Sequence, residues 1–161
     1  MKKEEMYISI AKIVKNSREQ VHALVKDLTH EQWMMIPAGH DNNIAWNVGH
    51  LIWGQLGLTY GRTDLEMPIS REPYISMYGI GTSPADWETE PDPSMLLETF
   101  MEMAYRMVAD AEAGLFDDAA FAPWQTGGGA KFDTLRDMMI YNVAHEGEHR
   151  GMIMALKNHT A

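Results

Sequence analysis

The sequence predicts an all-α protein, a four-helix bundle with a long crossover between its second and third helices. Four segments carry apolar residues at alternating steps of three and four, which is the period of a helix buried on one face. No segment shows the sustained two-residue alternation of a half-buried strand. The chain has 161 residues, 45% of them hydrophobic, which is enough for one core. We therefore predict a single domain over residues 1–161.

The first predicted helix runs from about Glu4 to Leu28. Thr29 and the break at Pro37-Ala38-Gly39 end the helical pattern. Four charged residues fall off the apolar stripe: Lys12, Lys15, Arg18 and Glu19. The stripe itself consists of Ile10, Val14, Ser17, Val21, Leu24 and Leu28.

The second predicted helix begins after Asp41-Asn42-Asn43, a cluster of residues that favour the N-cap position. It extends from Ile44 to near Tyr60-Gly61. An irregular crossover follows, from about Arg62 to Pro93, with five of the seven prolines. Connections of this length are usually functional or wrap the domain. The helix stripe is Ile44, Val48, Leu51, Gln55 and Leu58, and the crossover has Tyr74, Tyr78 and Trp87 with which to pack.

The third predicted helix follows Pro93-Ser94 and ends near Gly114, a natural C-terminal stop. A second link contains Pro123-Trp124 and Gly127-Gly128-Gly129. Because no strand precedes the glycines and no Gly-Lys-Ser/Thr follows them, we interpret this link as a flexible loop and not as a phosphate-binding loop. The stripe of the third helix is Leu96, Phe100, Met103 and Met107.

The fourth predicted helix opens at Thr134, where Thr134-Leu135-Arg136-Asp137 is similar to a capping box with Asp in place of Glu. Its stripe is apolar at both ends and polar in the middle. Burying polar groups without partners costs a few kcal/mol each, so we expect something to compensate them. The stripe is Leu135, Met138, Asn142, His145, His149, Met152 and Leu156.

Composition excludes several classes of function. Thirteen basic residues against 23 acidic ones give a net charge of −10, which argues against nucleic acid or an anionic membrane as the main partner. Cysteine is absent, so disulfides, thiolate zinc sites and a cysteine nucleophile are excluded, and any thiol chemistry needs an external thiol. No signal peptide is visible, and the longest apolar stretch, Ile44–Leu58, is interrupted and short for a bilayer. We expect a cytoplasmic protein. Its 14 methionines favour an adaptable core over a binding surface.

His145 and His149 lie one helical turn apart on the fourth stripe. Side chains at i and i+4 lie one above the other on a helix, so the two imidazoles can converge on one metal ion. On the pair alone, a metal site and two core histidines satisfied by their neighbours fit equally well. The residue types around a third histidine decide between them.

His50 shares its face of the second helix with polar, small and aromatic residues, where a helix without a site more often carries Leu or Val. A third neutral imidazole completes a common open metal site, so the metal interpretation leads. We interpret Gly54 and Gly57 as sites of close packing, and Trp46 and Trp53 as core or dimer residues. The other four histidines, His22, His30, His40 and His159, are expected to be dispensable.

The segment His145-Glu146-Gly147-Glu148-His149 also matches the zinc-protease helix motif. The surroundings do not support a protease: the longer form of the motif would need Gly where this chain has Met152 and His where it has Ala155. No Asp or Glu follows His149 that could act as a downstream ligand. Of the two glutamates, Glu146 lies closer to the stripe and is the better candidate base, although a solvated or helix-pairing carboxylate is the commoner role for either.

Two segments carry a resemblance to a known family. Ile44-Ala45-Trp46-Asn47-Val48-Gly49-His50-Leu51 resembles the second-helix signature of the DinB/YfiT-like proteins. Thr134-Leu135-Arg136-Asp137, leading into His145-Glu146-Gly147-Glu148-His149-Arg150-Gly151, resembles their last helix. The order of elements also matches, with one histidine on helix two, a long crossover and a histidine pair on helix four. Many members have Gln where this chain has Met152.

The resemblance implies an often dimeric four-helix bundle that holds zinc or nickel through three histidines, by position His50, His145 and His149. Some relatives transfer or isomerise small molecules with a low-molecular-weight thiol. The implied function is therefore a metal-dependent transferase that joins such a thiol to a small electrophile. Trp46 and Trp53 would form one pocket wall, and the crossover would form a lid.

Three alternatives stay open. One is a non-catalytic metal-binding protein induced by stress or DNA damage, a second is a metal-dependent hydrolase, and a third is a helical interaction module with satisfied core histidines. For the homodimer, we expect a surface that combines the first or second helix with residues 62–93. The excess of Met and Trp over the needs of one core is consistent with such a surface.

Overall fold

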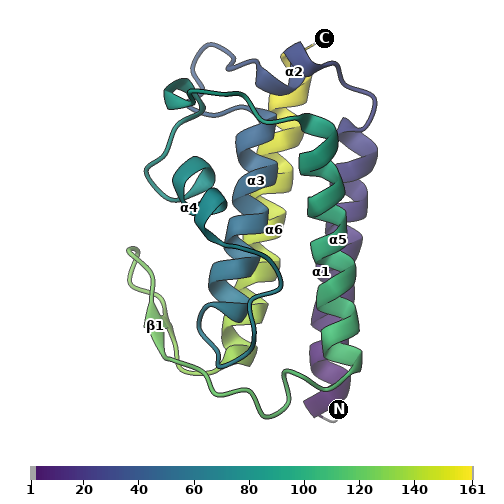
Figure 1. Cartoon of the computed structure of the whole chain (residues 1–161), viewed down its shortest axis with the longest axis vertical. Helices are drawn as coiled ribbons and strands as arrows, with labels where there is room; N and C mark the ends of the chain where they lie inside the picture. Colours follow the sequence, from purple (N-terminus) through teal and green to yellow (C-terminus); the bar gives the residue numbers. More distant parts are fainter. Residues whose placement is uncertain (1–2, 161) are drawn as a thin grey trace.

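The computed structural model describes residues 3–160, and four long helices dominate this part of the chain. Figure 1 shows α1, α3, α5 and α6 running side by side, with α3 and α6 adjacent and α1 beside α5. The predicted all-α bundle and its long crossover are confirmed. The four helices are α1 (Lys3–Val25), α3 (Ile44–Gln55), α5 (Pro93–Glu112) and α6 (Leu135–Asn158).

Short elements fill segments that the sequence predicted to be irregular. Helix α2 (His30–Met34) lies in the first link, and α4 (Glu72–Tyr78) and the turn η2 (Pro84–Asp86) lie in the crossover. The link before α6 forms a small antiparallel hairpin, β1 (Trp124–Gln125) with β2 (Lys131–Phe132), which corrects the prediction that the chain has no strand. The triple glycine is the tip of this hairpin. Such short elements depend on packing against the bundle, so periodicity does not predict them.

The helix ends follow the capping chemistry of the sequence. The Asn43 side chain accepts a hydrogen bond from the Trp46 amide, 2.7 Å away, and so begins α3. The Thr134 side chain does the same for the Asp137 amide at the start of α6. At its other end α3 continues into a wider π-helical turn, η1 (Leu56–Tyr60). Such turns often occur at functional sites.

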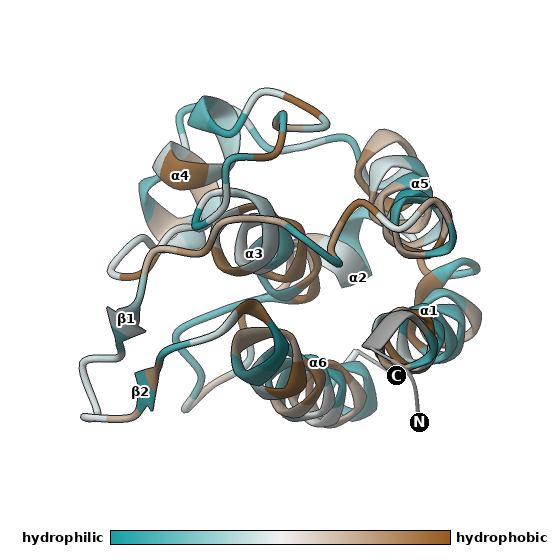
Figure 2. Ribbon diagram, turned by 90° about the horizontal axis from the view of Figure 1, so that it is seen from below, coloured by the Kyte–Doolittle hydropathy of each residue, from teal (hydrophilic) through white to brown (hydrophobic). Residues whose placement is uncertain are grey.

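The apolar stripes meet in one core between the helices. Every predicted stripe residue of the second and third helices is buried. Figure 2 shows α3 with α4 on one side and α6 on the other, and α3 is buried along nearly its whole length, with Trp53 as its one partly exposed residue. Helix α3 therefore has no free face for a partner. No helix within residues 3–160 is long and apolar enough to span a bilayer.

Two stripe predictions are wrong. Arg18, which falls off the first stripe, has a fully buried side chain. Met152, placed on the fourth stripe, is 49% exposed, and Ile153 occupies the buried position instead. The first helix also ends at Val25 and not at Leu28.

Candidate metal centre

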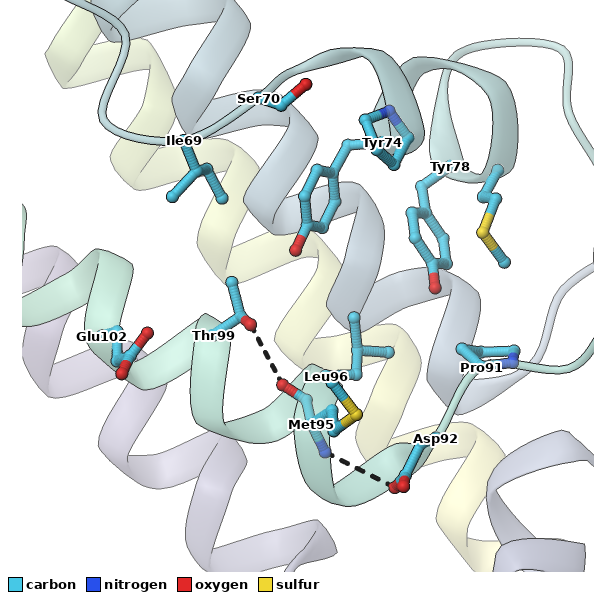
Figure 3. A pocket seen from close by; sticks show the side chains of 12 residues that line it. Ile69, Ser70, Tyr74, Tyr78, Pro91, Asp92, Met95, Leu96, Thr99 and Glu102 are labelled. Carbon is cyan, nitrogen blue, oxygen red and sulfur yellow. Dashed lines mark hydrogen bonds between the residues drawn. The ribbon is translucent and has the colours of Figure 1, made fainter.

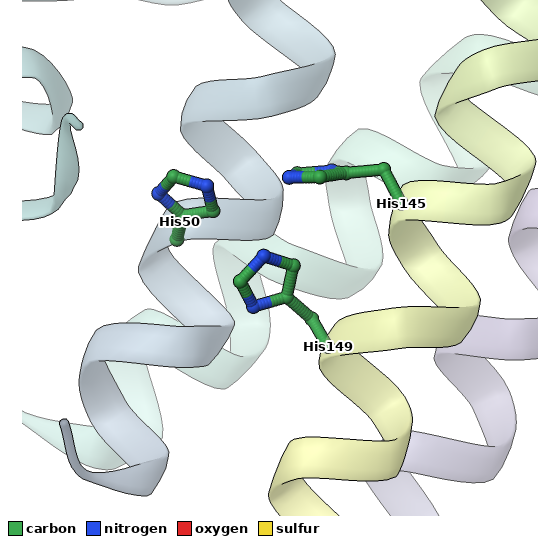
Figure 4. A group of neighbouring side chains, drawn as sticks. All are labelled: His50, His145 and His149. Atoms are coloured by element: carbon green, nitrogen blue, oxygen red, sulfur yellow. The ribbon is translucent and has the colours of Figure 1, made fainter. Parts of the chain in front are cut away.

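Three histidines converge between α3 and α6. His50 comes from α3, and His145 and His149 come from successive turns of α6 (Figure 4). One ring nitrogen from each lies within 4.8 Å of the other two. All three side chains are buried, the most exposed at 9%. The structure thus brings together the three predicted residues in an arrangement that could hold a metal ion.

Two of the rings are fixed in one tautomer by hydrogen-bond acceptors. His50 Nδ1 lies 2.6 Å from the Tyr78 carbonyl oxygen, which can only accept, so Nδ1 carries the proton. His149 Nδ1 lies 2.8 Å from Asn47 Oδ1. The amide nitrogen of Asn47 donates to the Asn43 carbonyl, so its oxygen must face His149. Both histidines therefore keep the Nε2 lone pair, the form that ligates a metal.

The third histidine, His145, packs against glycine. A Cβ atom at Gly54 would lie 2.9 Å from His145 Cε1, so only glycine lets α6 approach α3 this closely. Within residues 3–160, His145 Nδ1 has no hydrogen-bond partner, and neither amide atom of the buried Asn142 has one. These unsatisfied polar atoms gather beside the centre. The interpretation of Gly54 as a close-packing residue is therefore supported, with His145 as the side chain that it admits.

The surroundings keep the three imidazoles neutral. Burial, reinforced by the neighbouring His50, lowers the pKa of His145 to about 4. Burial together with His145 and His50 lowers the pKa of His149 to about 3. Burial also lowers the pKa of His50, against the opposing hydrogen bond to Tyr78. At neutral pH all three side chains are in the state that a divalent metal requires.

Aromatic rings surround His50. Trp46 and Trp53 stack on its two sides, with ring centroids 4.5 Å and 4.8 Å from that of His50. The indole N–H of Trp46 donates to Thr82 in the crossover, at 2.9 Å. Trp46 is buried, as expected of a core residue, and Trp53 is partly exposed. In the crossover, α4 packs against α3, and its last residue, Tyr78, bonds to His50.

The β1–β2 hairpin packs near His145 through two aromatic rings. Phe132 of β2 packs on Tyr141, with ring centroids 4.9 Å apart, and Tyr141 in turn stacks 6.4 Å from His145. The link that the sequence predicted to be a flexible loop therefore contributes packing beside the candidate centre.

Glu146 does not face the histidines. Its carboxylate Oε1 accepts hydrogen bonds from Arg18 Nε at 3.0 Å and from Nη2 at 2.6 Å. Arg18 also donates to the carbonyls of Leu51 and Phe100, so it joins four helices. Burial raises the pKa of Glu146, and Arg18 opposes that shift. Glu146 thus takes the helix-pairing role, and the glutamate of the zinc-protease motif is not placed to act as a base.

The remaining four histidines lie away from the centre. His30, His40 and His159 are exposed, and His22 is partly exposed. His30 pairs with Glu90 at 2.7 Å, and the rings of His40 and His159 pack against each other.

A separate cavity of about 470 Å³ lies between α4 and α5. Figure 3 shows Tyr74 and Tyr78 on one side and Leu96 and Thr99 on the other. None of the three clustered histidines lines it. Tyr78 links the cavity to the candidate centre, because it lines the cavity and its backbone carbonyl accepts a hydrogen bond from His50.

The sequence patterns did not assign the two groups that fix the histidine tautomers, the Asn47 side chain and the Tyr78 carbonyl. Asn47 precedes His50 by three residues, so its amide lies on the same helix face as that histidine. That spacing could have indicated a polar partner near the histidines. The role of the Tyr78 carbonyl could not be predicted in this way, because every residue has a backbone carbonyl.

A model of the DinB superfamily matches residues 14–153, and the chain belongs to this family. No curated protein matches the chain. The chain thus combines membership of the DinB superfamily with a buried histidine cluster that could hold a metal ion.

Proposed function

We propose that this DinB protein binds one divalent metal ion, zinc or nickel, through His50, His145 and His149, and transfers a low-molecular-weight thiol to a small electrophile. The observation that carries the proposal is the convergence of three neutral imidazoles, two of them locked with Nε2 free. Three imidazoles leave coordination positions open on a divalent ion for another ligand. Because imidazoles are neutral, the ion keeps its full charge of +2.

A divalent ion bound there would supply acidity, because a coordinating thiol loses its proton near neutral pH. The transfer forms a sulfur–carbon bond while the electrophile's leaving group departs with its electron pair, and the thiol proton leaves as the other product. The chain's own part is to hold and shield the reactants. Trp46 and Trp53 provide apolar surface beside His50, which excludes water from one side.

Hydrolysis is the weaker candidate, because the one carboxylate proposed as a base, Glu146, is bound to Arg18. A non-catalytic metal-binding role in stress or DNA damage is the main alternative. It shares the same histidines and differs only in the absence of turnover.

We also propose that the chain forms a homodimer. Because α3 is buried, we place this surface on α1 and the crossover and not on the second helix. Both carry exposed apolar side chains, Ile13 on α1 and Ile75 and Ile80 in the crossover. Light scattering at micromolar concentration with metal bound tests this, and a monomer mass would count against it.

The function is tested by mixing metal-loaded protein with a panel of cellular thiols and a chromogenic electrophile near neutral pH. The His50→Ala protein, stripped of metal, is the control. We expect at least one thiol to react faster with the wild-type protein than with the control. If no thiol does, the transferase proposal fails and the non-catalytic metalloprotein replaces it.

A further inference from the structure

Arg71 is a cation for which the described residues provide no anionic partner. It lies directly before α4, and its guanidinium packs on η1, the turn that continues α3, with Nη2 3.3 Å from the Cβ position of Gly57 and Nη1 3.2 Å from that of Gly61. Within residues 3–160 it has no ion pair and no side-chain hydrogen bond, and its Nε is buried without a partner. In a chain with 23 acidic residues, an unpaired guanidinium this close to the protein interior is unusual.

The guanidinium shares a face of α3 with the candidate metal centre. His50 and Gly57 are seven residues apart, so they lie nearly in line on the helix, about 10 Å apart along its axis. Gly54, which contacts His145, lies between them on the same side. Figure 2 shows α3 between α4, which directly follows Arg71, and α6, which carries the other two histidines.

A second donor without a partner lies on this face. Trp53 stacks on His50, one turn before Gly57, and its indole N–H is buried with no hydrogen-bond acceptor among the described residues. Indole and guanidinium N–H groups only donate, and neither side chain has an acceptor in the part of the chain that the structure describes. The Trp53 indole and the Arg71 guanidinium therefore both need an acceptor oxygen. A carboxylate has two such oxygens.

We infer that the thiol used by this protein carries a carboxylate, which Arg71 binds while the sulfur occupies the metal. The inference rests on the proposed function. The axial separation of about 10 Å, less about 2.3 Å for a metal–sulfur bond and about 2.9 Å for a hydrogen bond, leaves roughly 5 Å between the sulfur and the carboxylate. Amino-acid and short-peptide thiols have this span. Arg71 is thus a specificity-determining residue for the thiol.

The test compares two thiols that differ in one group, 4-mercaptobutanoate and 4-mercaptobutan-1-ol. Each is titrated into cobalt-loaded protein, and the thiolate-to-cobalt charge-transfer absorption gives the dissociation constant. A charge-assisted hydrogen bond predicts that the wild-type protein binds the acid roughly tenfold more tightly than the alcohol. Arg71→Gln should remove this preference while leaving affinity for the alcohol and for cobalt unchanged, and Arg71→Lys should keep part of it.

Arg136→Gln, a change at an exposed arginine paired with Asp137, is the matched control and should keep the full preference. Equal binding of acid and alcohol by the wild-type protein overturns the inference and leaves the proposed function standing. An unchanged preference in Arg71→Gln also overturns it, and means that Arg71 serves only as a cation at the C-terminal end of the α3–η1 helix. If neither thiol alters the cobalt spectrum, thiol binding at the metal fails, and the inference fails with it.

Discussion

Asn47 is the side chain on which the orientation of His149 depends. Its oxygen accepts the His149 Nδ1 proton at 2.8 Å, and its nitrogen is held by the Asn43 carbonyl. Partners of this kind fix the tautomer of a ligating histidine and raise its basicity.

Replacing Asn47 by Ala should therefore lower the affinity for zinc by roughly 10- to 100-fold with little loss of helix content. Competition with a chelator measures the affinity, and circular dichroism checks the fold. Asn158→Ala, at an exposed position near the end of the same helix as His149, is the matched control. Equal affinities for the two variants would show that Asn47 does not support the ligand.

The neutral histidines make the metal-free protein sensitive to acid. The folded-state pKa values of His145 and His149, about 4 and about 3, lie below the ordinary value of 6.5. Between these values the unfolded chain binds more protons than the folded one, so stability falls as the pH drops below about 6.5. The loss is about 1.4 kcal/mol per pH unit for each such histidine.

Urea unfolding of chelator-treated protein from pH 7 to pH 4.5 measures this slope. The His145→Ala/His149→Ala variant lacks both groups and should show a flatter dependence, whatever its absolute stability. Identical slopes for the two proteins would mean that these histidines are not buried in their neutral form.

At the scale of the elements, the approach of α6 to α3 depends on Gly54. An alanine there would place its Cβ 2.9 Å from His145 Cε1, closer than such atoms pack, so His145 would have to move. We expect Gly54→Ala to lower zinc affinity roughly tenfold or more, as loss of ligand orientation does.

Gly151→Ala is the control within α6, because nothing lies within 4 Å of its Cβ position. This change should leave zinc affinity unchanged and raise the free energy of unfolding by about 0.5–1 kcal/mol, since alanine restricts the unfolded chain more than glycine does. Isothermal titration and urea unfolding give the two quantities. A Gly54→Ala protein that binds zinc like the wild type would contradict the packing role.

The long helices and the histidine cluster were predictable because both follow from helical periodicity. A stripe places residues i, i+4 and i+7 on one side whatever surrounds the helix, so His145 and His149 could be paired from the sequence. Helix α4 and the hairpin were not predictable, because they are too short to show a period and are stabilised by packing. Arg18 was misplaced because charged side chains usually face solvent, and its burial is explained by partners far away in the sequence, the Glu146 carboxylate and the carbonyls of Leu51 and Phe100.

At the scale of the whole molecule, the buried Arg18–Glu146 pair connects the four long helices to one another. Both side chains are almost completely buried, and Arg18 also holds the carbonyls of α3 and α5. Removing one partner of such a pair leaves an uncompensated buried charge, which costs about 3–5 kcal/mol.

Arg18→Met should therefore destabilise the metal-free protein by about that amount, and adding Glu146→Leu should restore much of the loss. Urea unfolding of the wild-type, single and double variants measures the effect. A double variant no more stable than Arg18→Met would show that the buried carboxylate is not the source of the cost.

The central claim is that three histidines from two helices form one metal site. The direct measurement is the metal content of protein purified without an affinity tag or chelator, determined by elemental analysis, followed by zinc and nickel titration. We predict close to one divalent ion per wild-type chain and none in the His145→Ala/His149→Ala variant. Wild-type protein that binds zinc and nickel no better than this variant would contradict the account.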